Sequence, residues 1–289
     1  MTDQASGLRR LMGEQGEKST RVITITSGKG GVGKSSIALN LAIALSRRGQ
    51  RVLIFDTDFG LSNINVMLGV STRYDLLDVI KRDMDICDVI EQGLEGVQFI
   101  SGGSGVYELT QLGGEELMRI MNNLKALQDV ADVILLDTGA GISDNILRMI
   151  YASHETLVVT TPEPTAVVDA YALVKIVSER GSGAQLSLIV NKAGSAAEAE
   201  SVMDCLVRIA EKNVDTRLGK LGFVERDENM QKAIRTQVPI LVSYPNSPAS
   251  VNIETIASKL VKTPARAAEV PGFKGFLERF LGRSAVRLG

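Results

Sequence analysis

The chain has 289 residues, of which 44% are hydrophobic and 23% charged, and its formal net charge is −2. These values fit a soluble globular protein with one large or two small α/β domains, and they give no sign of a strongly basic nucleic-acid-binding protein. No apolar run approaches the length of a membrane-spanning helix, and a single histidine, His154, makes a histidine-based metal site untenable. Cys87 and Cys205 lie too far apart in sequence to suggest a disulfide framework, so we expect two buried thiols in a cytoplasmic protein.

Short β-branched apolar runs alternate with helical patterns along the chain. Strands are predicted over residues 22–27, 52–56, 97–101, 133–137, 156–161, 186–191 and 220–224. Helices are predicted over residues 35–48, 115–128, 143–152, 164–180, 196–212, 228–236 and 250–262. This alternation predicts an α/β fold with a mainly parallel sheet, helices on both faces, and a ligand site at the carboxyl ends of the strands.

The first strand and the first helix enclose a glycine-rich octapeptide, which is the strongest signal in the chain. Its glycines let the backbone turn its N–H groups toward an anion, and the helix start adds partial positive charge. We expect Lys34 to reach the β- and γ-phosphates and Ser35 to offer its hydroxyl to Mg²⁺. The predicted nucleotide-binding residues here are Gly28, Lys29, Gly30, Gly31, Val32, Gly33, Lys34, Ser35 and Ser36.

Two further predicted strands end in carboxylates on the same side of the sheet. Asp137 and Asp58 are placed to hold Mg²⁺ directly or through its water shell. Asp58 is also placed to position or activate a water in line with the γ-phosphate. Asp56 either supports the metal shell or serves as a turn or capping carboxylate. Gly139 and Gly141 suggest a loop whose shape depends on the γ-phosphate.

Asn191, at the end of another predicted strand, is the residue expected to contact the nucleotide base. A guanine site usually has Asn-Lys, one residue, then Asp, but Gly194 stands in that last place here. The amide of Asn191 can still bond the edge of adenine, which favours ATP. The alternative is an asparagine that caps the next helix.

With these residues the chain resembles the MinD/ParA family of deviant Walker ATPases over about residues 21–262. The resemblance rests on Lys29 as the signature lysine, on Asp56 and Asp58 in the first switch, and on the second switch from Asp137 to Gly141, where proline is commoner than Gly139. Asn191 matches the base-contacting position. Asp227 ends a loop that matches the family's adenine loop, except that its proline is missing.

The resemblance implies a low-turnover, Mg²⁺-dependent switch that hydrolyses ATP to ADP. It is expected to be a homodimer when ATP is bound and a monomer otherwise, with Lys29 reaching the partner's nucleotide across the interface. Lys29, Lys34 and Asp58 are then the predicted catalytic residues. A lysine in that place stabilises developing phosphate charge much as an arginine finger does. The alternative for Lys29 is a contact to its own nucleotide or a solvated side chain.

The N-terminal segment, residues 1–20, resembles a short signature of the flagellar-number regulators known as FlhG, FleN or YlxH. In that group the segment stimulates the GTPase FlhF, and Gln4 and Arg9 are the residues we expect to matter most. Flagellar switch proteins or a flagellar transcription regulator are further implied partners, and no direct DNA binding is expected. The residues that carry the match are Asp3, Gln4, Ala5, Leu8 and Arg9.

The C-terminal segment, residues 264–289, reads as a linker followed by an amphipathic helix. Its apolar side chains fall on one helical stripe with basic residues beside it, a pattern typical of a helix at an anionic membrane surface. The alternative is a helix docked on the 21–263 body, and the two states can alternate. We therefore expect a cytoplasmic protein that attaches reversibly to the inner face of the cell membrane. The stripe consists of Phe273, Phe276, Leu277, Phe280 and Leu281.

Two other functions share most of these motifs. A MinD-type regulator of the division site would have the same loop, switches and tail without needing the N-terminal signature. A ParA-type DNA-partition ATPase would need basic residues on its dimer surface and no amphipathic tail. An iron–sulfur reductase is disfavoured by the positions of the two cysteines.

Overall fold

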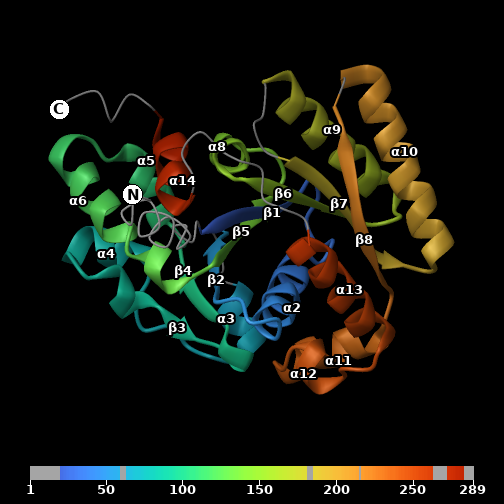
Figure 1. Ribbon diagram of the computed structural model, residues 1–289, viewed down its shortest axis with the longest axis horizontal. Helices are drawn as coiled ribbons and strands as arrows, with labels where there is room; N and C mark the ends of the chain where they lie inside the picture. Colours follow the sequence, from blue (N-terminus) through green and yellow to red (C-terminus); the bar gives the residue numbers. More distant parts are fainter. Residues whose placement is uncertain (1–19, 59–62, 181–184, 215, 263–271, 283–289) are drawn as a thin grey trace, which may run out of the picture.

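The computed structural model describes residues 20–58, 63–180, 185–214, 216–262 and 272–282. Its centre is a sheet of eight strands in the order β3-β4-β2-β5-β1-β6-β7-β8 (Figure 1). Every neighbouring pair is parallel except β3 and β4. The predicted α/β fold is confirmed. The strands are β1 (Arg21–Ser27), β2 (Val52–Thr57), β3 (Glu91–Gln92), β4 (Gln98–Ser101), β5 (Val133–Ala140), β6 (Glu155–Thr160), β7 (Gln185–Ala193) and β8 (Leu218–Glu225).

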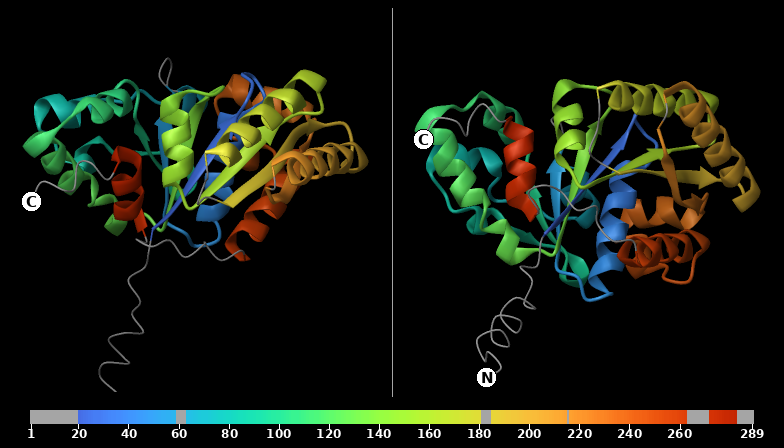
Figure 2. Two further views of the ribbon diagram at one scale, coloured as in Figure 1. Left: turned by 90° about the horizontal axis from the view of Figure 1, so that it is seen from above. Right: turned by 45° about the horizontal axis from the view of Figure 1, so that its top comes forward.

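Helices cover both faces of the sheet (Figure 2). Alternating side chains of the strands divide the core between these two faces. In β1, for example, Ile23 and Ile25 point to one face and Val22 to the other. The first face is covered by α2 (Lys34–Ser46), α3 (Asn63–Leu68), α11 (Glu228–Thr236), α12 (Ile240–Ser243) and α13 (Pro248–Lys262). The second is covered by α4 (Leu76–Arg82), α5 (Gly105–Gln111), α6 (Gly114–Leu124), α7 (Leu127–Val130), α8 (Asp144–Ala152), α9 (Pro164–Glu179), α10 (Ala196–Val214) and α14 (Gly272–Leu281).

Strand register brings the predicted carboxylates to one place. Asp56 of β2 lies directly beside Asp137 of β5, and β5 in turn pairs with β1, which leads into the glycine-rich loop. The carboxyl ends of these three adjacent strands therefore form one edge.

Several elements differ from the sequence prediction. The helix predicted over residues 115–128 is broken into α6 and α7, and α3, α4, α5, α12 and the two-residue strand β3 were not predicted because they are too short for a periodic signal. The expectation of two buried thiols is wrong: Cys87 is exposed and Cys205 is only partly buried. Cys87 lies in a 3₁₀ helix, η1 (Ile86–Val89), whose first and last residues take the buried positions.

The C-terminal helix α14 is folded into the core. It packs against α7, α8 and β1, and its stripe residues join the cluster between the sheet and the helices α4 to α8 (Figure 1). Phe273, Phe276, Leu277 and Phe280 are all buried, and Leu281 is partly buried. Within the described ranges, no helix has the length and apolar character needed to cross a membrane. Of the two anticipated states of this helix, the docked one is present here.

Candidate nucleotide-binding site

The glycine-rich loop leaves β1 and enters α2 through backbone conformations that favour glycine. Gly31 and Gly33 have φ angles of 76° and 91°. A Cβ on Gly33 would lie 2.3 Å from Nδ2 of Asn191, so a side chain is excluded there by strain and by space. Gly33 also precedes α2 without a capping side chain, which leaves the first N–H groups of the helix open to an anion.

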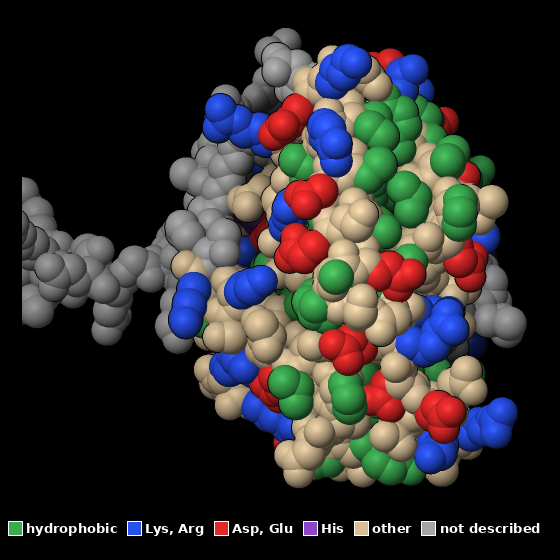
Figure 3. Space-filling model, turned by 90° about the vertical axis from the view of Figure 1, so that its right-hand side faces the viewer, with side chains coloured by type: hydrophobic (Ala, Val, Ile, Leu, Met, Phe, Trp, Pro, Cys, Tyr) green, Lys and Arg blue, Asp and Glu red, His purple; other side chains and the backbone are tan. Residues whose placement is uncertain are grey.

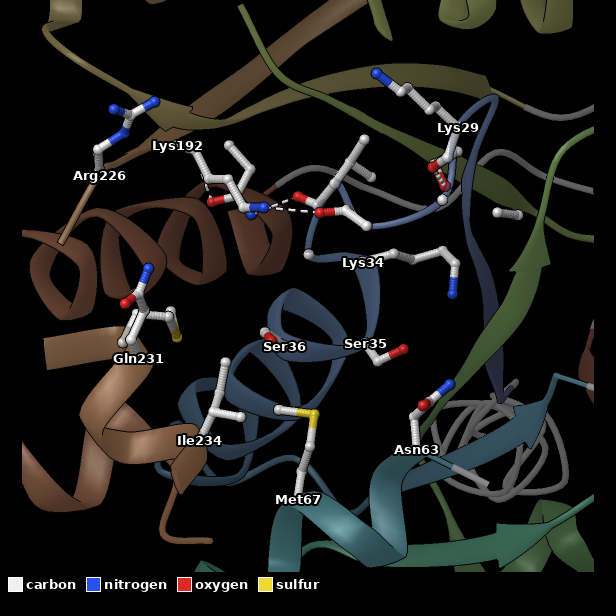
Figure 4. Close-up of a pocket in the computed structure, with 18 of the residues that line it drawn as sticks. Lys29, Lys34, Ser35, Ser36, Asn63, Met67, Lys192, Arg226, Gln231 and Ile234 are labelled. Atoms are coloured by element: carbon white, nitrogen blue, oxygen red, sulfur yellow. Dashed lines mark hydrogen bonds between the residues drawn. The ribbon is translucent and has the colours of Figure 1, made fainter. Parts of the chain in front are cut away.

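A cavity of about 790 Å³ lies over this loop (Figure 4). Its apolar side is formed by α3 and α11, and its polar side by the loop and the strand ends. It brings together most of the predicted site: Lys29, Gly30, Gly31, Val32, Gly33, Lys34, Ser35, Ser36, Asp58, Asn191 and Asp227. The lining also includes residues that the sequence reasoning missed, among them Asn63, Met67, Glu163, Lys192, Arg226, Met230 and Ile234.

Three predicted residues lie behind the lining. Gly28 packs against α9, where a Cβ would meet the carbonyl oxygen of Asp169 at 2.3 Å. Asp56 and Asp137 are buried beneath the loop. Gly28 therefore sets how closely the loop approaches α9.

Lys34 and Asp137 form a buried ion pair at the base of the loop. Lys34 Nζ lies 2.8 Å from Asp137 Oδ1. Burial raises the pKa of the Asp137 carboxyl, and the Lys34 ammonium opposes that rise. The other carboxylate oxygen of Asp137, Oδ2, is buried and has no hydrogen-bond partner in the described part of the chain. Together with the hydroxyl of Ser35, this spare carboxylate oxygen supplies the hard oxygen ligands that suit Mg²⁺.

Asp56 and Asp58 have different surroundings. Asp56 Oδ2 accepts the backbone N–H groups of Asn63 at 2.8 Å and Ile64 at 3.2 Å, so it holds the start of α3. Asp58 faces the cavity, and its carboxylate accepts a 3.3 Å hydrogen bond from the side chain of Asn63. This geometry corresponds to the capping alternative for Asp56 and leaves Asp58 accessible for contact with a nucleotide or water.

Lys29 points away from Lys34 and Ser35 (Figure 4). Its ammonium lies 3.0 Å from Oε2 of Glu163, the residue before α9, and 2.7 Å from Oγ1 of Thr165, in the first turn of that helix. The hydrogen bond from Lys29 lowers the pKa of the Glu163 carboxyl. The signature lysine is thus held at the exposed rim of the site by a residue that no sequence motif indicated.

Asn191 and Lys192 brace the loop from the end of β7. Asn191 Nδ2 donates to the carbonyl of Val32 at 2.7 Å, and Lys192 Nζ donates to the carbonyl of Gly31 at 2.7 Å. An amide nitrogen has two hydrogens, so Asn191 keeps one for a base that enters the cavity. The signal for Lys192 was its place beside Asn191 at a strand end.

Asp227 lies at the far end of the cavity. It caps α11 by accepting the N–H of Asn229 at 2.9 Å, and it also accepts the N–H of Ala249 at 3.2 Å. The same lining includes the apolar side chains of Met67, Met230 and Ile234, and Met67 and Ile234 lie below Ser36 (Figure 4). The cavity therefore has a cationic phosphate end at the loop and an apolar end that suits a planar base.

This fold and this loop define a P-loop nucleotide-binding protein. A model of the ParA family, described as NUBPL iron-transfer P-loop NTPase, matches residues 18–261. The chain is 32% identical over 266 residues to the antiactivator FleN of Pseudomonas aeruginosa, covering 92% of this chain and 95% of that protein. It is 35% identical over 292 residues to the flagellum site-determining protein YlxH of Helicobacter pylori, covering 97% and 99%.

Structural comparison gives the same result. The cell division ATPase MinD of Pyrococcus furiosus superposes with a TM-score of 0.67 at 25% identity, covering 84% of this chain and 98% of that one. MinD of Pyrococcus horikoshii, solved in complex with Mg-ADP, has a TM-score of 0.67 at 24% identity, covering 87% and 100%. The chain belongs to the ParA/MinD family of P-loop NTPases. Members of this family are ATPases that bind their nucleotide with Mg²⁺.

Proposed function

We propose that this protein is an ATP-driven dimerisation switch that cycles on and off the membrane and regulates the number or placement of flagella. The observation that carries the proposal is the position of Lys29, whose ammonium stands at the exposed rim of the site and not over its own loop. A cation placed there is positioned to reach the nucleotide of a second copy. The flagellar assignment is supported by the similarity to FleN and YlxH over nearly the whole chain.

Each residue of the site has a role in the proposed cycle. Bound Mg²⁺ would neutralise phosphate charge, held by Ser35 and by Asp137 directly or through water. Lys34 leaves Asp137 to contact the phosphates, and Asp58 orients a water toward the γ-phosphate. Lys29 of the second copy exchanges Glu163 for phosphate oxygens, which joins hydrolysis to dimerisation.

The tail supplies the membrane step. Its apolar stripe is buried against the body of the chain, so a monomer in this conformation presents little of it to a lipid surface. One short helix binds an interface weakly, whereas two tails on one dimer act together at high effective concentration. Release of α14 on dimerisation would therefore make attachment depend on ATP.

The N-terminal segment supplies the proposed partner contact. Asp3, Gln4, Ala5, Leu8 and Arg9 lie outside the described residues, so their role rests on the sequence signature. We propose that they stimulate GTP hydrolysis by an FlhF-type GTPase. The name antiactivator given to FleN supports a flagellar transcription regulator as a further partner.

Two experiments test the proposal. The full chain and a variant ending at Pro271 are sedimented with vesicles containing anionic lipid, with ATP, with ADP and without nucleotide. We expect ATP-dependent sedimentation of the full chain only, with equal ATP binding by both; equal sedimentation of both would reject the tail's role. A peptide of residues 1–20 is added to the partner GTPase, with a Gln4→Ala, Arg9→Ala peptide as control, and only the native peptide should stimulate hydrolysis.

A MinD-type division regulator is the second candidate, because MinD of Bacillus subtilis is 30% identical over 244 residues. It would show the vesicle result without the peptide result, so the two experiments separate the candidates. A DNA-partition ATPase receives less support. The face over α10 and β8 carries both signs of charge intermixed, as in the contacts of Lys220 with Glu200 and Asp204 (Figure 3).

A further inference from the structure

Helix α8 connects the nucleotide site with the docked tail. It begins at Asp144, directly after the short loop that contains Gly141, whereas Gly139 belongs to the end of β5 and not to a loop. Ser143 caps the start of α8 by accepting the N–H of Ile146. It ends at Ala152, and α14 packs along it. Any displacement of the end of β5, which carries Asp137, or of the β5–α8 loop therefore acts on the start of a helix that supports the tail.

Arg279 of α14 holds the other end of α8. Its Nε and Nη2 both donate to the carbonyl oxygen of Ala152, at 2.9 and 2.7 Å. Ala152 is the last residue of α8, so its carbonyl belongs to the group of helix-end acceptors without an intrahelical partner. A guanidinium there is also favoured by the partial negative charge of the helix end. The contact is thus a charge-assisted, two-donor attachment of the tail to α8.

The residues that lie beneath α14 adjoin the carboxylates of the nucleotide site. Thr57, between Asp56 and Asp58, donates through Oγ1 to the backbone carbonyl of Asp137 at 3.0 Å and lies 3.5 Å from Met149 Sδ of α8. Thr57 and Met149 also line a small gap of about 20 Å³ beneath Phe276 and Phe280. One layer of side chains therefore separates the metal carboxylate from the underside of α14.

We propose that Arg279 is a latch that holds the tail on α8, and that the latch opens when α8 moves together with the β5–α8 loop. The proposal deepens the membrane cycle proposed above and rests on it. The two described bonds of Arg279 converge on one carbonyl oxygen, so a small shift of Ala152 weakens these two together. Thr57 and Met149 provide a second contact through which rearrangement around Asp137 reaches the helix.

Arg279 could instead act as a lipid contact, because a basic residue beside an apolar stripe also attracts anionic lipid. The two roles predict opposite effects of removing it. Loss of a lipid contact weakens vesicle binding in every nucleotide state. Loss of a latch strengthens binding in the nucleotide-free state, because the tail is then released without ATP.

The test compares Arg279→Ala with Lys274→Ala, which removes an exposed cation from the same helix. Vesicle sedimentation is measured without nucleotide and with ATP, using anionic phosphatidylglycerol vesicles. We expect Arg279→Ala to bind several-fold more than the wild type without nucleotide, and Lys274→Ala to keep the wild-type dependence on ATP. If Arg279→Ala weakens vesicle binding in every nucleotide state, Arg279 is a lipid contact and the latch is rejected; binding without nucleotide that stays at the wild-type level rejects the latch as well.

Hydrogen exchange of the full chain without vesicles gives an independent measurement. In the nucleotide-free protein, Arg279→Ala should speed exchange of the α14 amides by roughly ten- to a hundredfold, the effect of losing hydrogen bonds to a charged group. Lys274→Ala should leave it unchanged, and unchanged exchange in Arg279→Ala would overturn the latch. Wild-type protein that never binds vesicles would reject the proposed membrane cycle, while the exchange data would still decide whether the latch exists.

Discussion

The ammonium of Lys34 lies 2.8 Å from Oδ1 of Asp137, and both side chains are buried. The lysine expected to contact phosphate and the carboxylate expected to hold Mg²⁺ therefore neutralise each other. We expect binding of Mg-ATP to replace this pair by two others, Lys34 with phosphate and Asp137 with the metal shell. The pair keeps both charges in place for that exchange and avoids an uncompensated buried charge.

Asp137→Asn should uncouple ATP affinity from Mg²⁺. The amide keeps the volume of the side chain but loses the charge that holds the metal shell, so the gain in ATP affinity on adding Mg²⁺ should fall by about 10- to 100-fold. Calorimetric titration with ATP, with and without Mg²⁺, measures this. ATP affinity without Mg²⁺ should not fall, because Lys34 loses its competitor. An unchanged effect of Mg²⁺ would exclude Asp137 from the metal site.

Gly33→Ala should abolish nucleotide binding. It places a methyl group 2.3 Å from Asn191 Nδ2 at a φ of 91°. The matched control is Gly49→Ala, which imposes similar strain at a φ of 81° but has open space around it and lies outside the cavity. Both changes should cost on the order of 1 kcal/mol of stability through strain. Only Gly33→Ala should eliminate binding of a fluorescent ATP analogue, and equal binding by the two variants would contradict the loop geometry.

Lys29→Ala and Asp58→Ala should abolish the hydrolysis that depends on partner and lipid. Lys29 stands outside its own phosphate site, so its loss should leave ATP affinity largely intact while stimulated turnover falls to the basal rate. Phosphate release is measured with vesicles and partner present, and Lys220→Ala, a surface change far from the loop, is the control. Near-normal turnover in both site variants would refute the mechanism.

Phe276→Ala should weaken the docking of α14. Phe276 is buried and stacks on Phe273 and Phe280, with ring centroids 5.6 and 5.8 Å away. Removing a buried phenylalanine side chain costs about 3–5 kcal/mol, whereas partly buried Leu281 should cost clearly less. Urea denaturation measures global stability, and hydrogen exchange detects detachment of α14 alone. A change in Phe276→Ala no greater than in Leu281→Ala, by both methods, would contradict the docked helix.

His154 should make stability depend on pH below neutrality. Burial, followed by the nearby Arg279, lowers its pKa from 6.5 to about 4. The unfolded chain then binds more protons between these values, so the contribution is complete above about pH 6.5 and is lost as pH falls toward 4. The shift corresponds to about 3 kcal/mol. His154→Gln removes the chain's single histidine, so the difference between the two urea-denaturation profiles over this range isolates its effect; parallel profiles would exclude it.

Features that depend on local periodicity and motif spacing could be predicted from the sequence. Alternating apolar runs predicted the parallel sheet, and its geometry required Asp56, Asp58 and Asp137 to meet near the loop. The loop predicted a nucleotide because glycines, a helix start and Lys34 act within one short segment. These inferences needed no knowledge of which distant side chains touch.

The contacts that these residues make depend on the tertiary structure. Nothing local indicated that Glu163 holds Lys29. The sequence left open whether Asp56 supports the metal shell or serves as a cap, and for Lys192 it offered only a place beside Asn191. The tail shows the physical reason most clearly. An apolar stripe predicts that one face of a helix is buried away from water, but a membrane and a protein groove can both bury it. The choice of the groove depends on Phe55, Leu136 and Met149, which are brought together from β2, β5 and α8 only when the chain folds.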